Sequence, residues 1–311
     1  MKEIIRIQSL VATGRFTLPV VILIFLLLWG VSIQEWDELI SLGITIVIGY
    51  VLIETNTAFN LIRTRTAMPV CFYWLVSAIL FFLHPFEWVN LLPLLFVLAS
   101  YQLFLSYESH SLSAPSFHSF LFVSLGSIVF PQFLFLVPLF WSCMISFRAM
   151  SWKSFLASLI GLITPYWILL GYAFCFNEMQ LVLTPLQGIV RLSPLDYCHL
   201  TLSEWASWAF ITLLFIVCGF HYWTVSYMDK TRTRLCHSYL IISGFWTTIL
   251  SVLQPVYLCE WMSIQLICTA FLSGHLFTLT RNRFSGILFI VTFVAYLLLL
   301  SFNLWMQSFN S

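Results

Sequence analysis

The sequence predicts an all-α fold, a polytopic transmembrane bundle of about 11 helices (roughly 10–12) with a cytoplasmic N-terminus. Of the 311 residues, 61% are hydrophobic and 8% are charged, against about 45–50% and about 25% in soluble domains. Mean hydropathy is +0.97. Because so few charges cannot cover a water-exposed surface, the composition excludes a soluble enzyme, a nucleic-acid binder and a disordered chain. The lipid bilayer is the partner it implies.

Charge-poor segments of near membrane length follow one another along the whole chain. A bilayer core of roughly 30 Å needs about 20 apolar helical residues. We find no soluble domain and no linker between these segments, so we treat residues 1–311 as a single integral membrane domain. The expected crossing segments are residues 16–33, 39–56, 67–84, 89–106, 116–130, 131–147, 154–175, 205–226, 236–255, 261–279 and 284–306.

Basic residues orient the bundle, because short cytoplasmic loops collect lysine and arginine. With the N-terminus inside, all of the 13 basic residues except Arg191 fall on the cytoplasmic side. The sequence therefore predicts a multi-pass protein of the cell inner (cytoplasmic) membrane. The inner basic residues are Lys2, Arg6, Arg15, Arg63, Arg65, Arg148, Lys153, Lys230, Arg232, Arg234, Arg281 and Arg283.

The apolar stretch 116–147 forms either one long kinked helix or two short helices broken at Pro131. If the stretch were one helix, every later loop would lie on the opposite side of the membrane and the basic residues would be divided between the two sides. We therefore predict two crossings. Helices this short, interrupted by proline, mark either a functional site or a tight outer turn with local bilayer adaptation.

Residues 176–204 form the large outer (periplasmic) loop in this topology. The loop is rich in leucine and valine, so we expect it to lie on the membrane surface, and its length makes it a functional candidate. Cys175 and Cys198 stand at positions where a disulfide across the loop is an open alternative. The eight cysteines include no C-x-x-C pair, and we predict no metal site.

Glu35, Asp37 and Glu38 are the catalytic candidates, since three carboxylates fall within four residues of the first outer loop. Clustered carboxylates can accept a proton from a sugar hydroxyl or bind a divalent cation. The alternative is that they only orient and solvate the loop. The chain contains no P-loop, dinucleotide fingerprint or catalytic triad order, so the cofactor is unknown and enzymatic activity stays open.

Arg191 and His275 are the substrate-binding candidates. The guanidinium of Arg191, in the large outer loop, can hold a diphosphate. His275 lies well inside a predicted crossing segment, where an ionisable group indicates either function or a hydrogen bond between helices. Glu54 lies near the cytoplasmic end of its segment, where it can reach solvent or pair with Arg63 or Arg65. No other crossing segment contains Asp, Lys or Arg, which argues against an ion-coupled carrier.

Two stretches resemble known families. Residues 56–85, NTAFNLIRTRTAMPVCFYWLVSAILFFLHP, and residues 118–173 resemble an uncharacterised family of multi-pass inner-membrane proteins from Bacteroides-type bacteria. The same stretches are similar to the membrane core of C-type glycosyltransferases and lipid-linked polysaccharide polymerases. This resemblance implies a carboxylate in the first outer loop, matched here by Glu35, Asp37 or Glu38, acting on a polyprenyl-linked sugar.

Three functions follow from these observations. The first is a component of cell-envelope biogenesis that handles or scaffolds lipid-linked material, and the absence of a strong catalytic constellation favours it. The second is an outer-face glycosyltransferase or polymerase acting on polyprenyl-linked sugars. The third is a transporter or lipid flippase, indicated by the break at Pro131. The expected partners are a lipid-linked glycan or another envelope membrane protein.

Overall fold

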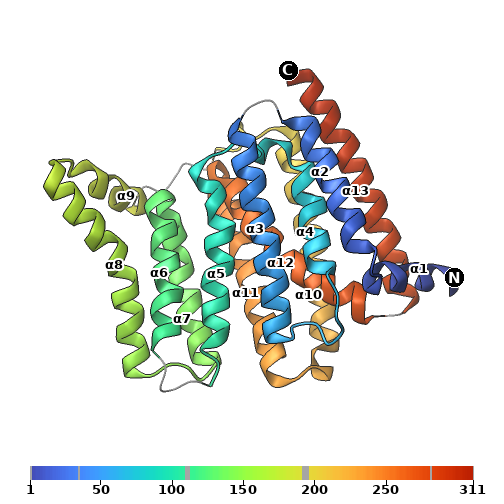
Figure 1. The fold of residues 1–311 in the computed structure, drawn as a ribbon, viewed down its shortest axis with the longest axis horizontal. Coiled ribbons are helices and arrows are strands. Elements are labelled where there is room, and N and C mark those ends of the chain that lie inside the picture. The colour runs from blue at the N-terminus through green and yellow to red at the C-terminus, as the bar shows by residue number, and fades with distance from the viewer. Residues whose placement is uncertain (1, 34–35, 109–112, 191–195, 281, 311) are drawn as a thin grey trace. The chain divides into compact units, whose positions relative to one another are not determined.

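The computed structural model describes residues 2–33, 36–108, 113–190, 196–280 and 282–310, and the secondary structure of this part is helical throughout (Figure 1). Glu35, Arg191 and Arg281 lie outside the described residues. The α-helices are α1 (Lys2–Thr13), α2 (Thr17–Ser32), α3 (Trp36–Phe59), α4 (Met68–Ile79), α5 (Leu92–Leu105), α6 (Ala114–Val129), α7 (Val137–Ser146), α8 (Trp152–Phe176), α9 (Gln180–Val190), α10 (Leu202–Val225), α11 (Thr231–Leu253), α12 (Leu258–Leu279) and α13 (Arg283–Asn310). The 3-10 helices are η1 (Phe81–Leu83), η2 (Trp88–Leu91), η3 (Pro131–Leu136), η4 (Ser226–Met228) and η5 (Pro255–Tyr257).

Within the described residues, 7 helical segments are long and apolar enough to cross a membrane. Four shorter apolar helices, which include α2, α4 and α6, accompany them. Every crossing segment expected from the sequence coincides with one of these helices, because each is an uninterrupted apolar run with charges, prolines or polar residues at its ends. The membrane-length segments are Trp36–Phe59, Trp88–Leu105, Trp152–Phe176, Leu202–Met228, Thr231–Leu253, Pro255–Leu279 and Arg283–Gln307.

The helices form two compact units, each described by itself. Unit 1 consists of residues 1–90 and 195–311, and unit 2 of residues 91–194. The single membrane domain expected from the sequence stays a prediction.

Helix α12 is the central helix of unit 1. Buried residues make up 89% of its membrane-length stretch, against 17% for α13. It packs against α10, α11, α4 and α1. At Gly274 a β-carbon would come within 2.6 Å of Pro69 on α4, so glycine permits this close approach. A helix buried on all sides must be apolar or have its polar groups paired, and both conditions matter for the site below.

Several connectors of unit 1 meet at one end of this bundle, together with α1. The side chain of Gln8, which is 1% exposed, donates hydrogen bonds to the carbonyls of Phe277 and Thr280, both at 2.9 Å. Thr66, in the connector between α3 and α4, donates to the carbonyl of Ala12 at 2.6 Å. The basic N-terminal segment is therefore a helix attached beside the end of α12.

Unit 2 is built around the close approach of α6 and α8. The hydroxyl of Ser124 on α6 donates to the carbonyl of Leu162 on α8 at 2.6 Å, and Ser127 contacts Tyr166 at 2.8 Å. At Gly161 a β-carbon would lie 2.4 Å from the carbonyl oxygen of Phe117. Small and hydroxyl-bearing residues at the interface let two helix backbones approach, which is how transmembrane helices associate.

The stretch 116–147 forms two separate helices, α6 and α7, with η3 between them, as the sequence predicts. The break is densely packed. The ring of Phe133 is buried against Gly126, and Pro131 is seated on Gly188 of α9. The side chain of Gln132 also reaches the carbonyl of Gly188 at 3.5 Å.

The large segment 176–204 is in part helical, and this part is α9. Its Leu181, Leu183 and Leu186 are exposed, whereas Gly188 contacts the proline break. An apolar exposed face is typical of a helix that lies at a membrane surface, and the surface position expected for this segment stays a prediction.

Candidate functional site

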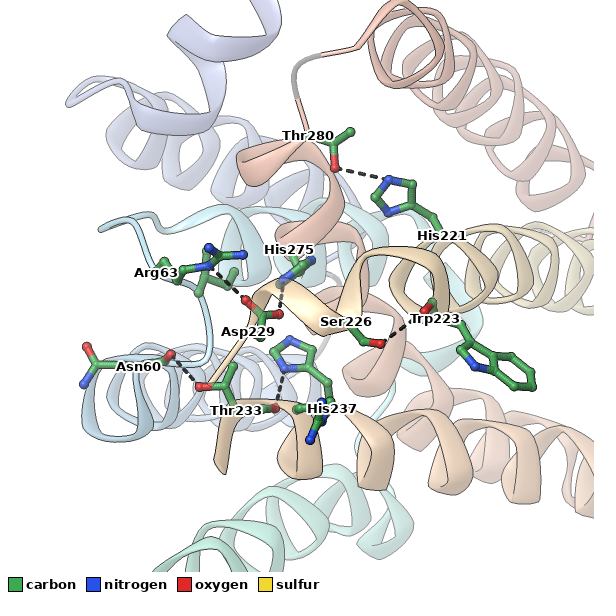
Figure 2. A network of polar contacts seen from close by, with 12 residues as sticks. Asn60, Arg63, His221, Trp223, Ser226, Asp229, Thr233, His237, His275 and Thr280 are labelled. Atoms are coloured by element: carbon green, nitrogen blue, oxygen red, sulfur yellow. Dashed lines mark hydrogen bonds and ion pairs between the residues drawn. The ribbon is translucent and has the colours of Figure 1, made fainter. Parts of the chain in front are cut away.

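The candidate site is a group of ionisable side chains buried at the end of unit 1 where the connectors meet (Figure 2). Asp229 is at its centre. This residue follows η4 and precedes α11, and the side chain of this carboxylate is 1% exposed. Its amide donates to the carbonyl of Ser226 at 3.1 Å, which closes the turn and directs the extended residue inward. An aspartate buried to this degree requires charged or hydrogen-bonding partners.

Arg63 provides the positive charge. Its Nε lies 2.9 Å from Asp229 Oδ1, and its side chain is 47% exposed, so it links the buried carboxylate to solvent. The connector that carries Arg63 is held in place by Asn56, whose side chain accepts from the amide of Ile62 at 3.2 Å and donates to the carbonyl of Thr66 at 3.3 Å. Arg63 is thereby fixed beside Asp229, as Figure 2 shows.

His275 of α12 contacts the second carboxylate oxygen, with 3.0 Å between its Nε2 and Asp229 Oδ2. Because an ionised carboxylate only accepts hydrogen bonds, Nε2 carries the proton and donates it. The other ring nitrogen, Nδ1, is buried and has no hydrogen-bond partner among the described residues. His275 therefore presents a lone pair that can take up a proton.

His237 of α11 is arranged in a similar way. Its Nδ1 contacts the carbonyl of Thr233 at 3.1 Å and must donate there, while its buried Nε2 lacks a partner in the described part of the chain. The rings of His237 and His275 are 5.0 Å apart. Tyr222 of α10 stacks on His237 at 4.6 Å and meets His275 edge-on at 4.9 Å. Three helices thus contribute one aromatic or imidazole ring each.

Electrostatics favour the ionised form of Asp229. Burial on its own raises the pKa of a carboxyl group, but the hydrogen bond from His275 and the positive charge of Arg63 outweigh it. As a result, the pKa of Asp229 lies below its ordinary value. The carboxylate is therefore the fixed negative charge of the site.

The lowered pKa of Asp229 predicts an acid-sensitive contribution to stability. A carboxyl group with a depressed folded-state pKa stabilises the fold above its unfolded pKa, about 3.9, and this stabilisation is lost as the pH falls through the folded value. We expect the melting temperature of the wild type to exceed that of Asp229→Asn at pH 6, and the difference to shrink steadily below about pH 4. Thermal unfolding of both proteins in the same micelles measures it. A difference independent of pH would contradict the ion pair.

Polar side chains continue from this group along α12. Gln265, ten residues before His275 or about 15 Å along the helix, donates to Thr212 of α10 at 3.1 Å and to Thr248 of α11 at 2.9 Å. Between them Cys268 contacts Ser243 at 3.4 Å. The interface of α10, α11 and α12 therefore contains a buried polar line, defined by Asp229, His275, Cys268 and Gln265, that reaches the middle of the central helix.

The carboxylates singled out from the sequence are placed elsewhere. Asp37 and Glu38 lie in the first turn of α3, Asp37 exposed and Glu38 half-buried, whereas Glu35 falls outside the described residues. Acidic residues in a first helical turn are stabilised by the helix dipole, so this position has a structural reason of its own. Their catalytic role stays a prediction.

Of the two binding candidates, Arg191 lies outside the described residues, and His275 is the buried partner of Asp229. Glu54 is exposed, and the ion pair of Arg63 is made with Asp229 instead. Cys175 and Cys198 are exposed and are not joined by a disulfide. Among the described residues, no group of three His, Cys, Asp or Glu side chains is arranged to hold a metal ion.

Sequence reasoning missed Asp229, His237 and Tyr222. A buried charge is conspicuous only inside an apolar crossing segment, and Asp229 belongs to a connector. A signal was present, however. Asp229 is an acidic residue in the basic run MDKTRTR, on the side where the sequence predicts positive charge. Comparison with protein-family models, with curated proteins and with solved structures gives no significant match for this chain.

Proposed function

We propose that this chain is a multi-pass protein of the cell inner membrane that moves lipid-linked material of the cell envelope through the bilayer, linked to a proton exchanged at His275. Of the three functions expected from the sequence, this combines the handling of lipid-linked material with the transporter alternative. In this proposal eleven helices cross the membrane, the N-terminus is cytoplasmic, and the site lies on the cytoplasmic side.

The observation that carries the proposal is the buried pair of Asp229 and His275, which the half-exposed Arg63 links to solvent. Ionisable groups inside a membrane protein are costly and characteristically mark proton relays and transport pathways. Asp229 holds the protonated nitrogen of His275, and the unpaired Nδ1 of His275 is then the position where a proton binds and leaves. The two protonation states differ by one full charge in a buried place, which is sufficient to change how α10, α11 and α12 pack.

The proton path in this proposal follows the polar line toward Gln265. The break at Pro131, which indicated a transporter in the sequence, is filled by Phe133 and covered by Gly188. The proposal therefore rests on the polar residues of α12 and not on this break. A lipid-linked molecule has an apolar chain that remains in the bilayer, and only its polar headgroup has to pass the protein.

Transfer of a lipid-linked probe tests this function. We expect the full-length chain in liposomes to transfer a fluorescent polyprenyl phosphate between leaflets, measured as the fraction that external dithionite quenches, and an imposed pH gradient to accelerate it. His275→Gln keeps a donor for Asp229 but does not titrate. We expect this variant to lose the acceleration and to transfer at least about tenfold more slowly, as is typical when a positioned proton-transfer group is removed.

Asp196→Asn is the matched control. Asp196 pairs with His199 at the same distance, 3.0 Å, but on an exposed turn, so its loss should leave transfer unchanged. Protein-free liposomes set the background rate. A wild type no faster than this background, or a His275→Gln variant that keeps the response to the pH gradient, contradicts the proposal.

A further inference from the structure

A small cavity lies in unit 1 at the other end of α10 from Asp229. Its volume is about 190 Å³, and it is lined by Phe81, Phe82, Ser203, Asn303, Met306 and Gln307. Ser203 is in the first turn of α10 and Asp229 follows the last, so roughly 36 Å of helix separates the cavity from the ion pair. The cavity therefore belongs to a different part of the unit from the site described above.

Asn303 of α13 is the polar residue that indicates a ligand here. It is 4% exposed. Its amide nitrogen donates to the carbonyl of Ile79 at 2.8 Å and to the hydroxyl of Ser207 at 3.3 Å, which uses both hydrogens. Its amide oxygen is buried and has no hydrogen-bond partner among the described residues. Because an unpaired buried acceptor is unfavourable and Asn303 lines the cavity, a ligand donor that reaches this oxygen would complete the residue.

The other residues that line the cavity restrict the chemical class of ligand that could supply this donor. None of the six lining residues is charged, which disfavours a phosphate, a carboxylate or an ammonium group. Phe81, Phe82 and Met306 offer apolar surface, while Ser203 and Gln307 offer further hydrogen bonds. A ligand with an apolar face and several hydroxyls fits this combination, because binding pockets are mainly apolar with a few placed polar groups. The volume equals that of about six waters, close to one sugar ring.

We propose that this cavity binds one uncharged sugar ring, with a ring hydroxyl donating to the unpaired amide oxygen of Asn303 and an apolar ring face against Phe81 or Phe82. This inference names the headgroup of the lipid-linked material and so rests on the proposed function. It places the sugar at the end of the bundle opposite to the proton site. Binding is measured without transport, so the two proposals can fail separately.

The test compares probes with the same alkyl chain and different headgroups. Full-length protein in nanodiscs is equilibrated with radiolabelled octyl β-glucoside below its micelle concentration, and binding to protein-free nanodiscs is subtracted. We expect saturable binding of octyl β-glucoside, and binding at least about tenfold weaker for octanol, which cannot satisfy several polar groups. Octyl phosphate should bind no better than octanol. Equal binding of octanol, or tighter binding of octyl phosphate, overturns the proposal.

Two variants on α13 locate the site. Met306→Trp fills the cavity and leaves the hydrogen bonds of Asn303 intact, and we expect it to weaken glucoside binding at least about tenfold. Leu298→Trp places the same ring on an exposed position of the same helix, 66% exposed, and should change nothing. A Met306→Trp protein that is folded by circular dichroism and still binds the glucoside normally contradicts the assignment.

Asn303→Leu tests the acceptor directly, but it also removes the bonds to Ile79 and Ser207, so Met306→Trp remains decisive if Asn303→Leu does not fold. His275→Gln should leave glucoside binding unchanged. If His275→Gln keeps normal transfer of the polyprenyl phosphate while the glucoside binds, the proposed proton linkage fails and the sugar site stands. If the glucoside does not bind while transfer responds to His275→Gln, only the sugar site fails.

Discussion

Replacing Asp229 by alanine will lower the free energy of unfolding by about 2–3 kcal/mol. The substitution leaves the buried Nε2 of His275 without an acceptor, and it removes the counter-charge of Arg63. Loss of one member of a fully buried pair costs more than this, but Arg63 is half-exposed and can turn to water, which limits the cost. Unfolding of the full-length protein by sodium dodecyl sulfate in mixed micelles, followed by far-ultraviolet circular dichroism, measures the loss.

A double-mutant cycle separates the ion pair from general damage to the fold. If Asp229 and Arg63 interact as the geometry indicates, Asp229→Ala and Arg63→Ala together will cost clearly less than the sum of the two single changes. Asp196→Ala, which breaks the exposed pair with His199, should leave the unfolding transition in place. Additive effects of the two substitutions in the cycle would show that the pair contributes no interaction energy.

The helices of this chain could be predicted from the sequence much more completely than the candidate site. A helix that crosses a membrane must be apolar over its own length, so each described helix that matches an expected crossing segment is visible in the sequence as a local run of apolar residues. The stretch around Pro131 could be divided into two helices because one long helix there would place the later basic loops on the opposite side of the membrane. The basic segment before α2 was not recognised as α1, since its attachment depends on Gln8 reaching carbonyls 269 and 272 positions away.

The partner of His275 could not be predicted from local runs of residues. His275 itself is conspicuous, an imidazole in the middle of an apolar segment. Asp229 is 46 positions away in a connector, where an acidic side chain normally faces water. Only the packing of α10 and α11 around α12 brings the two together, and nothing local encodes it. Conversely, Asp37 and Glu38 attract attention as a cluster because they are adjacent in sequence, although adjacent residues on a helix do not face each other.

Replacing Gly161 by alanine will destabilise unit 2 by about 1–3 kcal/mol, the range found for overpacked interiors. The new methyl group would lie 2.4 Å from the carbonyl oxygen of Phe117 and 3.2 Å from the amide nitrogen of Leu121. Both are backbone atoms of α6 and cannot rotate away as a side chain can. The two helices must therefore move apart, which strains the hydrogen bond from Ser124 to Leu162. Thermal unfolding in micelles, compared between wild type and variant, measures the effect.

Gly171 on the same helix is the matched control, since a β-carbon there would meet no described atom within 4 Å outside its chain neighbours and the nearby backbone of its own helix. Alanine favours helix over glycine by up to about 1 kcal/mol, so Gly171→Ala should leave stability unchanged or raise it. The same gain in helix propensity acts at Gly161. The measured loss of stability of Gly161→Ala is therefore smaller than the cost of the steric clash itself. If the two substitutions had the same effect, the β-carbon at Gly161 could not lie as close as 2.4 Å to the carbonyl oxygen of Phe117. The close packing of α6 and α8, with its hydrogen bonds from serine hydroxyls, would then be contradicted.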